Sequence, residues 1–199
     1  MLLLYPGAGS DASHPSLLAT RDLVAPRPCV LEDFPYRRDG RKAPDRAPKL
    51  LASIRDDLDR HADAIAAAGG VILGGRSMGG RMCSLIAAGA DDHPPPPALR
   101  GLVLVAYPLH PPGKPDRLRV EHLPDVRVPT LFVSGSRDTF GSPDELRRWS
   151  ATMPARAKVR HIVIDGVGHG LEGCDHTIAG AIRDFADRLL GPVPSDRAG

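Results

Sequence analysis

The sequence predicts an α/β fold built on a six-stranded, mostly parallel sheet with helices on both faces. Short apolar runs alternate with longer amphipathic stretches along the chain, which is the pattern of repeated β–α units. The apolar runs also lack a polar face, as expected for strands that helices cover on both sides. Glycine and proline number 21 each, so we expect many turns between these elements.

The expected strands are short and mostly apolar, and turn residues or amphipathic stretches separate them. In chain order they are Leu2–Tyr5, Cys29–Asp33, Val71–Leu73, Leu102–Ala106, Thr130–Ser134 and Val159–Ile164. Two proline-rich segments, Pro94–Pro97 and Pro108–Pro115, are expected to be stiff connectors.

Five amphipathic stretches are the expected helices: Ser16–Val24, Ala47–Ala68, Met78–Ala90, Pro143–Met153 and Thr177–Leu190. The second and the last carry apolar residues near helical spacing. Gly69–Gly70 ends the second helix, and Gly191-Pro192 ends the last. Pro143 stands in a first turn, where its missing N–H costs nothing.

Size and charge restrict what the chain can be. With 199 residues and 42% hydrophobic side chains, it can bury roughly 70% of its unfolded surface. We expect a single domain over residues 1–191 and a flexible tail over 192–199. The 26 basic and 24 acidic residues nearly balance, which argues against a nucleic-acid or membrane partner. The oligomeric state is left open.

The cysteines Cys29, Cys83 and Cys174 lack the paired spacing of a disulfide framework, a metal knuckle or a redox motif. The N-terminus has no signal-peptide pattern, and no apolar run approaches the roughly 18 residues of a membrane span. We therefore expect a cytoplasmic protein that requires neither a metal nor a cofactor.

The sharpest motif is Gly75-Arg76-Ser77-Met78-Gly79, a G-x-S-x-G pentapeptide between an expected strand and an expected helix. There it indicates a nucleophile elbow, a turn so tight that the residues at Gly75 and Gly79 must be very small. Such a turn exposes the Ser77 hydroxyl at the carboxyl edge of the sheet. The alternative is a glycine-rich turn whose serine only caps the following helix.

A serine nucleophile needs a base, and the base needs an orienting acid. Asp138 follows the fifth expected strand, and His169 follows the sixth. Because the carboxyl ends of parallel strands share one edge, Ser77, Asp138 and His169 are expected to converge. The weaker alternatives for the acid and the base are Asp144, Asp165, His161 and His176. The remaining candidates, which fit solvated or hydrogen-bonded loop positions better, are His14, His110 and His122.

The segment Tyr5-Pro6-Gly7-Ala8-Gly9 follows the first expected strand and can form the loop of an oxyanion hole. Its glycines let the backbone approach a substrate and turn an amide toward it, so the amides of Ala8 and Met78 are candidate donors. The alternative is a plain turn between a strand and a helix. Further candidates for the lining of the pocket are Gly7, Arg76 and His110.

These motifs resemble the α/β-hydrolase superfamily, and most closely its small dienelactone-hydrolase-like members. The chain is also similar to the hydrolase-like segment in a regulatory subunit of the nonspecific-lethal histone acetyltransferase complex. The resembling segments run through almost the whole chain and are Leu2–Asp11, Phe34–Asp45, Gly74–Met82, Tyr107–Arg119, His122–Gly141 and Asp165–Glu172.

The resemblance implies Ser77 as nucleophile, Asp138 as acid and His169 as base, on a minimal core with strand order 2-1-3-4-5-6. Pro6 stands where the family commonly has a histidine before the oxyanion glycine. Dienelactone hydrolases have a cysteine where this chain has Ser77, so their named reaction is not expected. The connector Tyr107–Val128, about 22 residues, is too short for a multi-helix cap.

Two functional hypotheses follow. The first is a serine hydrolase of the carboxylesterase or thioesterase type that cleaves a small-molecule acyl substrate through an acyl-serine intermediate. Lactones and peptides are alternative substrates. The second is a protein-binding module that keeps the hydrolase fold with weak or no activity. The complete set of Ser77, Asp138 and His169 favours the enzyme.

Overall fold

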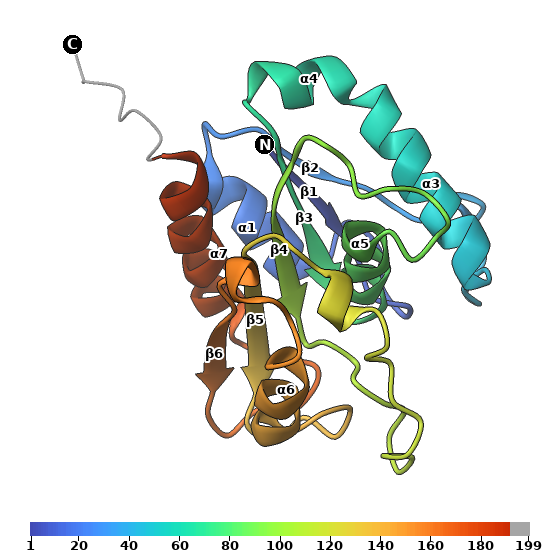
Figure 1. The fold of residues 1–199 in the computed structure, drawn as a ribbon, viewed down its shortest axis with the longest axis vertical. Helices are drawn as coiled ribbons and strands as arrows, with labels where there is room; N and C mark the ends of the chain where they lie inside the picture. The colour runs from blue at the N-terminus through green and yellow to red at the C-terminus, as the bar shows by residue number, and fades with distance from the viewer. Residues whose placement is uncertain (192–199) are drawn as a thin grey trace.

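The computed structural model describes residues 1–191, so the tail expected over 192–199 lies outside the described residues. Its six strands form one sheet in the order β2-β1-β3-β4-β5-β6, and every neighbouring pair is parallel (Figure 1). The predicted fold class and strand order are confirmed, with a sheet that is entirely rather than mostly parallel. The strands are β1 (Leu2–Tyr5), β2 (Cys29–Leu31), β3 (Val71–Arg76), β4 (Leu99–Val105), β5 (Thr130–Gly135) and β6 (Arg160–Ile164).

Helices connect the strands and cover both faces of the sheet. In the described part of the chain they are α1 (Pro15–Val24), α2 (Pro35–Arg38), α3 (Ala47–Arg60), α4 (Ala62–Ala67), α5 (Met78–Ala88), α6 (Pro143–Ser150) and α7 (Asp175–Leu190), with 3-10 turns η1 (Leu123–Asp125) and η2 (Ala155–Ala157). Figure 1 shows α1 beside α7 on one side of the sheet and α3 and α5 on the other. The helix α6 begins with a capping box in which Ser142 and Glu145 satisfy each other's backbone amides.

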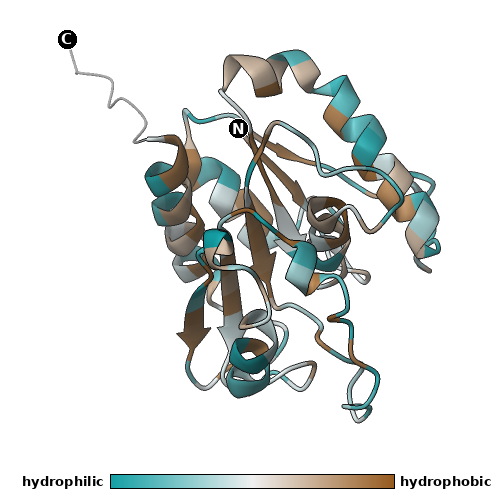
Figure 2. Cartoon of the chain, viewed as in Figure 1, coloured by the Kyte–Doolittle hydropathy of each residue, from teal (hydrophilic) through white to brown (hydrophobic). Residues whose placement is uncertain are grey.

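The core consists of two apolar layers, one on each face of the sheet. Along β1, Leu2 and Leu4 pack with α1 and α7, whereas Leu3 and Tyr5 pack with α3, α4 and α5. This alternation is the two-residue period of a strand, and both sets of side chains are fully buried. Figure 2 shows the strands as hydrophobic segments among helices of mixed character. Burial on both faces explains why the strands read as continuous apolar runs.

The helix expected over Ala47–Ala68 is divided into α3 and α4 at His61. The junction is held from outside, because the imidazole Nε2 of His61 lies 2.9 Å from Glu32 Oε1. The guanidinium of Arg60 donates to the same oxygen at 2.8 Å. Glu32 follows β2, so these are tertiary contacts at the point of division, and local periodicity does not contain them.

The strand β3 continues through both glycines to Arg76, three residues beyond the expected end at Leu73. Gly74 and Gly75 remain paired with β1 and β4. A Cβ at Gly74 would lie 2.5 Å from the carbonyl oxygen of Val103, so the missing side chain permits the close pairing. The sheet therefore leads directly to Ser77.

The connection from β4 to β5, described throughout, contains no helix other than the 3-10 turn η1. The expected absence of a large cap is thereby confirmed for this segment. Among the helices within residues 1–191, none is long and apolar enough to cross a membrane.

We expect His122 to make the fold less stable in acid. Burial, helped by the positive charge of Arg81, lowers its pKa from 6.5 to about 4. As the pH falls through about 6.5, His122 becomes protonated in the unfolded chain, whereas in the folded chain it stays neutral until about pH 4. The free energy of unfolding should therefore decrease over this window, by at most about 3 kcal/mol.

Urea unfolding of the wild type and of His122→Gln, between about pH 7 and pH 4.5, checks this expectation. The difference in unfolding free energy between the two proteins should shift in favour of the variant as the pH falls. His161, whose pKa burial also lowers, contributes equally to both proteins and cancels. A difference that stays constant with pH would contradict the assignment to His122.

Candidate active site

Ser77 lies on a strained turn between β3 and α5. Its backbone has φ 46° and ψ −115°, a region that residues with a side chain rarely occupy. Its amide donates to the carbonyl of Val105 at 2.8 Å, which ties the turn to the neighbouring strand. A Cβ at Gly79 would lie 2.5 Å from the carbonyl oxygen of Pro6, and one at Gly75 would collide with the carbonyl of Tyr5. Both elbow glycines are therefore required by close backbone approach.

The structure brings Ser77, Asp138 and His169 together. His169 Nε2 lies 2.9 Å from Ser77 Oγ, and Nδ1 lies 2.9 Å from Asp138 Oδ2 and 3.0 Å from Oδ1. The Asp138 side chain is fully buried, and that of His169 is 22% exposed. Because a carboxylate only accepts hydrogen bonds, the contact assigns the ring proton to Nδ1 and leaves Nε2 facing the serine.

Phe140 supports both the acid and the base. Its amide donates to Asp138 Oδ1 at 2.8 Å, and its ring stacks on the imidazole of His169 with centroids 4.0 Å apart. One residue therefore fixes the carboxylate and limits the tilt of the imidazole. The role of Phe140 could not be predicted, because a phenylalanine two residues after an aspartate carries no distinctive sequence signal.

The loops that carry Asp138 and His169 are fastened to each other and to the elbow. The Arg137 amide donates to the carbonyl of Val167 at 2.9 Å, and the Ser136 hydroxyl donates to Asp165 at 2.8 Å. The buried guanidinium of Arg76 donates to the carbonyl of Gly170 at 2.7 Å. Arg76 therefore holds the loop of the base from the position next to Ser77.

The candidate oxyanion donors, the amides of Ala8 and Met78, make no hydrogen bond to residues 1–191, and both residues line the cavity that contains Ser77. The Tyr36 hydroxyl donates to the carbonyl of Ala8 at 2.9 Å. Burial raises the pKa of Tyr36, which keeps that proton in place. Tyr36 thus braces the loop that follows Pro6.

The cavity beside Ser77 has a volume of about 360 Å³. Its lining comes from the oxyanion loop, α3, α5 and the loops after β4 and β5, and includes Arg81, Arg119, Asp45 and Phe140. The three residues expected to line it lie elsewhere. Gly7 lies behind Ser77, where an added Cβ would be 3.6 Å from the Cβ of that serine. Arg76 lines a separate hollow beside Gly170, and His110 is buried with Nδ1 2.9 Å from the carbonyl of Pro111.

The other candidate acids and bases have different partners. Asp144 pairs with Arg147 at the surface, and Asp165 accepts from Ser136. His161 lies 2.9 Å from Ser150 Oγ and stacks on a phenylalanine ring. His122 lies 2.7 Å from the hydroxyl of Ser84. The remaining two, His14 and His176, lie at the N-termini of α1 and α7.

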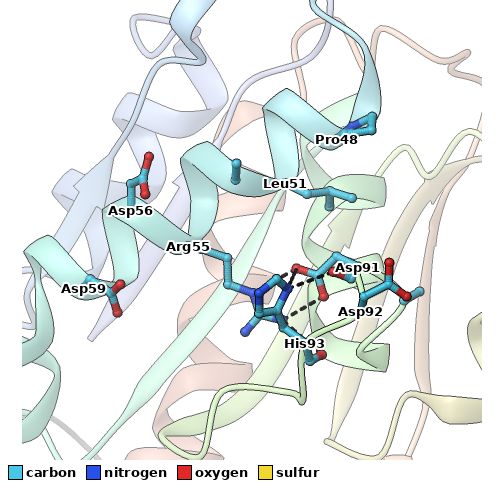
Figure 3. Close-up of a pocket in the computed structure, with 10 residues that line it drawn as sticks. Pro48, Leu51, Arg55, Asp56, Asp59, Asp91, Asp92 and His93 are labelled. Carbon is cyan, nitrogen blue, oxygen red and sulfur yellow. Dashed lines mark hydrogen bonds and ion pairs between the residues drawn. The ribbon is translucent and has the colours of Figure 1, made fainter.

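A larger groove of about 540 Å³ lies between α3 and the loop after α5 (Figure 3). It shares no lining residue with the cavity at Ser77. Arg55 donates to both carboxylate oxygens of Asp91 there, at 2.8 and 2.9 Å, so its charge is already balanced. The groove has no nucleophile with a base, and we place the candidate chemistry at Ser77. No cluster of three potential metal ligands occurs within the described residues.

A parallel sheet in the order 2-1-3-4-5-6, with a serine on a strained turn after its third strand, defines the class of α/β-hydrolase folds. The family model described as "Alpha/beta hydrolase domain" matches residues 1–180. The chain therefore belongs to the alpha/beta hydrolase domain family.

Three solved structures with the same fold each have little sequence identity to this chain. Est1E from Butyrivibrio proteoclasticus is 15% identical with a TM-score of 0.72, over 95% of this chain and 87% of that one. A monoacylglycerol lipase from Paleococcus ferrophilus is 13% identical with a TM-score of 0.72, over 96% and 94%. The esterase domain of a Rhodothermus marinus protein is 11% identical with a TM-score of 0.68, over 96% and 87%. At these identities the likeness establishes the fold alone.

Proposed function

We propose that the chain is a serine hydrolase that cleaves a small ester or thioester through an acyl-serine intermediate. The observation that carries the proposal is the continuous hydrogen-bonded line from Asp138 through His169 to Ser77 Oγ. The lipase and the esterase domain among the similar structures are named for ester cleavage, which supports the same reaction class. The dienelactone-hydrolase-like branch, the nonspecific-lethal subunit likeness and a cytoplasmic location remain predictions from the sequence.

In the proposed mechanism, His169 Nε2 accepts the Ser77 proton while Oγ attacks the acyl carbon. The amides of Met78 and Ala8 donate to the oxyanion that forms on the carbonyl oxygen. Nε2 then returns the proton to the departing alcohol or thiol, which leaves an acyl-serine ester. Water repeats the sequence and releases the acid. Asp138 holds Nδ1–H throughout, which stabilises the imidazolium.

The dimensions of the site support a short acyl group. The cavity of about 360 Å³ is at the small end of ligand pockets. The connection from β4 to β5 forms no helical cap above it, so nothing at that position would enclose a long alkyl chain.

We expect an alkyl fluorophosphonate to label Ser77. Oγ attacks phosphorus, the P–F bond breaks with loss of fluoride, and His169 takes the proton. Labelling should reach about one equivalent per chain and disappear in His169→Ala, because a serine without its base is a weak nucleophile. Intact mass and peptide mapping measure both results.

Two controls accompany this experiment. His176→Ala removes a histidine at the start of α7 and should label as the wild type does. Ser150, which also lies 2.9 Å from a histidine nitrogen, has no elbow or free amides and should stay unlabelled. Folded wild-type protein that takes up no probe between about pH 6 and pH 9 would instead favour the protein-binding module.

A further inference from the structure

Two arginines line the cavity at Ser77 from different parts of the chain. Arg81 lies on α5, one helical turn after the nucleophile, and Arg119 lies in the connection between β4 and β5. Residues four apart on a helix are separated by about 6 Å along its axis. Both guanidinium-bearing side chains therefore adjoin the space in which a small substrate must lie.

Neither guanidinium has an acidic partner among residues 1–191. Arg81 Nε is buried and forms no hydrogen bond, although its N–H is an obligate donor. Burial, together with the positive charge of Arg81, lowers the pKa of Arg119, so the two cations are close enough to repel each other. By contrast, Arg41 and Arg55 each form an ion pair with an aspartate.

The one acidic residue among the described cavity lining does not neutralise them. Asp45 accepts from Arg41 at 2.9 and 3.0 Å and pairs with Lys49 at 3.3 Å. Its charge is therefore matched by two cations outside the lining. Glu121, whose carboxylate accepts from the amide of Val120, is not among the residues that line the cavity. The cavity consequently has a positive electrostatic balance.

An anion would relieve this arrangement. Guanidinium groups bind carboxylates and phosphates through paired, charge-assisted hydrogen bonds. A bound anion would accept hydrogen bonds from the terminal amino groups of Arg81 and Arg119, which have no acidic partner among residues 1–191, and it would reduce the repulsion between the two cations. A neutral ester would leave that repulsion in place.

We propose that Arg81 and Arg119 bind an anionic group on the substrate, so that the natural substrate is an ester or thioester of acidic character. The inference rests on the proposed hydrolase function and assigns the two arginines to substrate specificity. The anion can belong to the acyl part, as in the half-ester of a dicarboxylic acid, or to the leaving group.

Matched pairs of esters distinguish these two sources. For the acyl side, the 4-nitrophenyl half-ester of adipic acid is compared with 4-nitrophenyl hexanoate, which has a methyl group in place of the terminal carboxylate. For the leaving-group side, 4-acetoxybenzoate is compared with neutral 4-acetoxybenzamide. We expect kcat/KM to favour the anionic member of at least one pair by about 10-fold or more, and added salt to weaken this preference.

Arg81→Gln and Arg119→Gln should each reduce that preference by about 10-fold, mainly through a higher KM for the anionic ester. The matched control is Arg117→Gln, which removes an equal charge from an exposed residue of the same connection. It should keep the preference. A loss of preference in all three variants would indicate a general charge effect and overturn the assignment.

The inference and the proposed function can fail separately. Turnover of the neutral esters with no preference for either anionic ester would overturn the inference and leave the hydrolase intact. If no ester is cleaved and no phosphonate reacts, calorimetry with adipate and with inorganic phosphate decides. Binding that weakens in Arg81→Gln and Arg119→Gln would support the anion site, and no binding at about 10 mM would refute it.

Discussion

Replacing either Ser77 or His169 with alanine is expected to lower kcat by about 10⁴–10⁶ on any ester that the wild type cleaves. The reason is that the nucleophile Ser77 and the base His169 take part in the same proton transfer, so neither side chain can act without the other. Ser77 Oγ lies 2.9 Å from the base, and a hydroxyl without a proton acceptor is a poor nucleophile at neutral pH. Steady-state kinetics with a chromogenic ester measure the effect, and circular dichroism checks that each variant is folded.

The double variant tests whether the two side chains act as a unit. Ser77→Ala/His169→Ala should be little worse than either single variant, because one change already abolishes the shared proton transfer. Independent contributions would multiply instead. A double variant that lost the product of the two single losses would argue against this mechanism.

The residues that the structure brings together at the site could be predicted because each depends on a local pattern combined with one rule of topology. The glycines around Ser77 mark a turn where backbone contacts leave no room for a Cβ. Asp138 and His169 each follow an apolar run, and parallel strands place their carboxyl ends on one edge of the sheet. The order and direction of the strands are therefore enough to predict that Asp138 and His169 lie close to Ser77.

The supporting residues could not be predicted, since their roles depend on contacts between distant segments. Tyr36 reaches the carbonyl of Ala8 across 28 positions of sequence, and Arg76 reaches Gly170 across 94. A tyrosine or an arginine in a sequence does not by itself indicate a contact with a distant backbone carbonyl. The positive character of the cavity was hidden for the same reason, because Arg81 and Arg119 meet only after α5 and the connection after β4 have packed.

Asp138→Asn is expected to lower kcat by about 10⁴ while leaving the fold intact. In the structure Asp138 Oδ1 accepts the amide of Phe140. The oxygen of the asparagine would keep that bond, which turns its NH₂ group toward His169 Nδ1. Nδ1 must then accept, so the ring proton moves to Nε2, which faces Ser77. A protonated Nε2 cannot take the serine proton, and the nucleophile stays inactive.

Asp144→Asn is the matched control, because Asp144 also follows β5 but pairs with Arg147 at the surface. It makes the same chemical change without touching the imidazole and should retain wild-type kcat within about 2-fold, as surface substitutions usually do. The fluorophosphonate separates a changed tautomer from a displaced loop: Asp138→Asn should label slowly at Ser77, with thermal unfolding near that of the wild type. If Asp138→Asn kept most of its activity while Asp165→Asn lost it, the acid would be Asp165, and the hydrogen bonds at Asp138 would serve only to hold the loop.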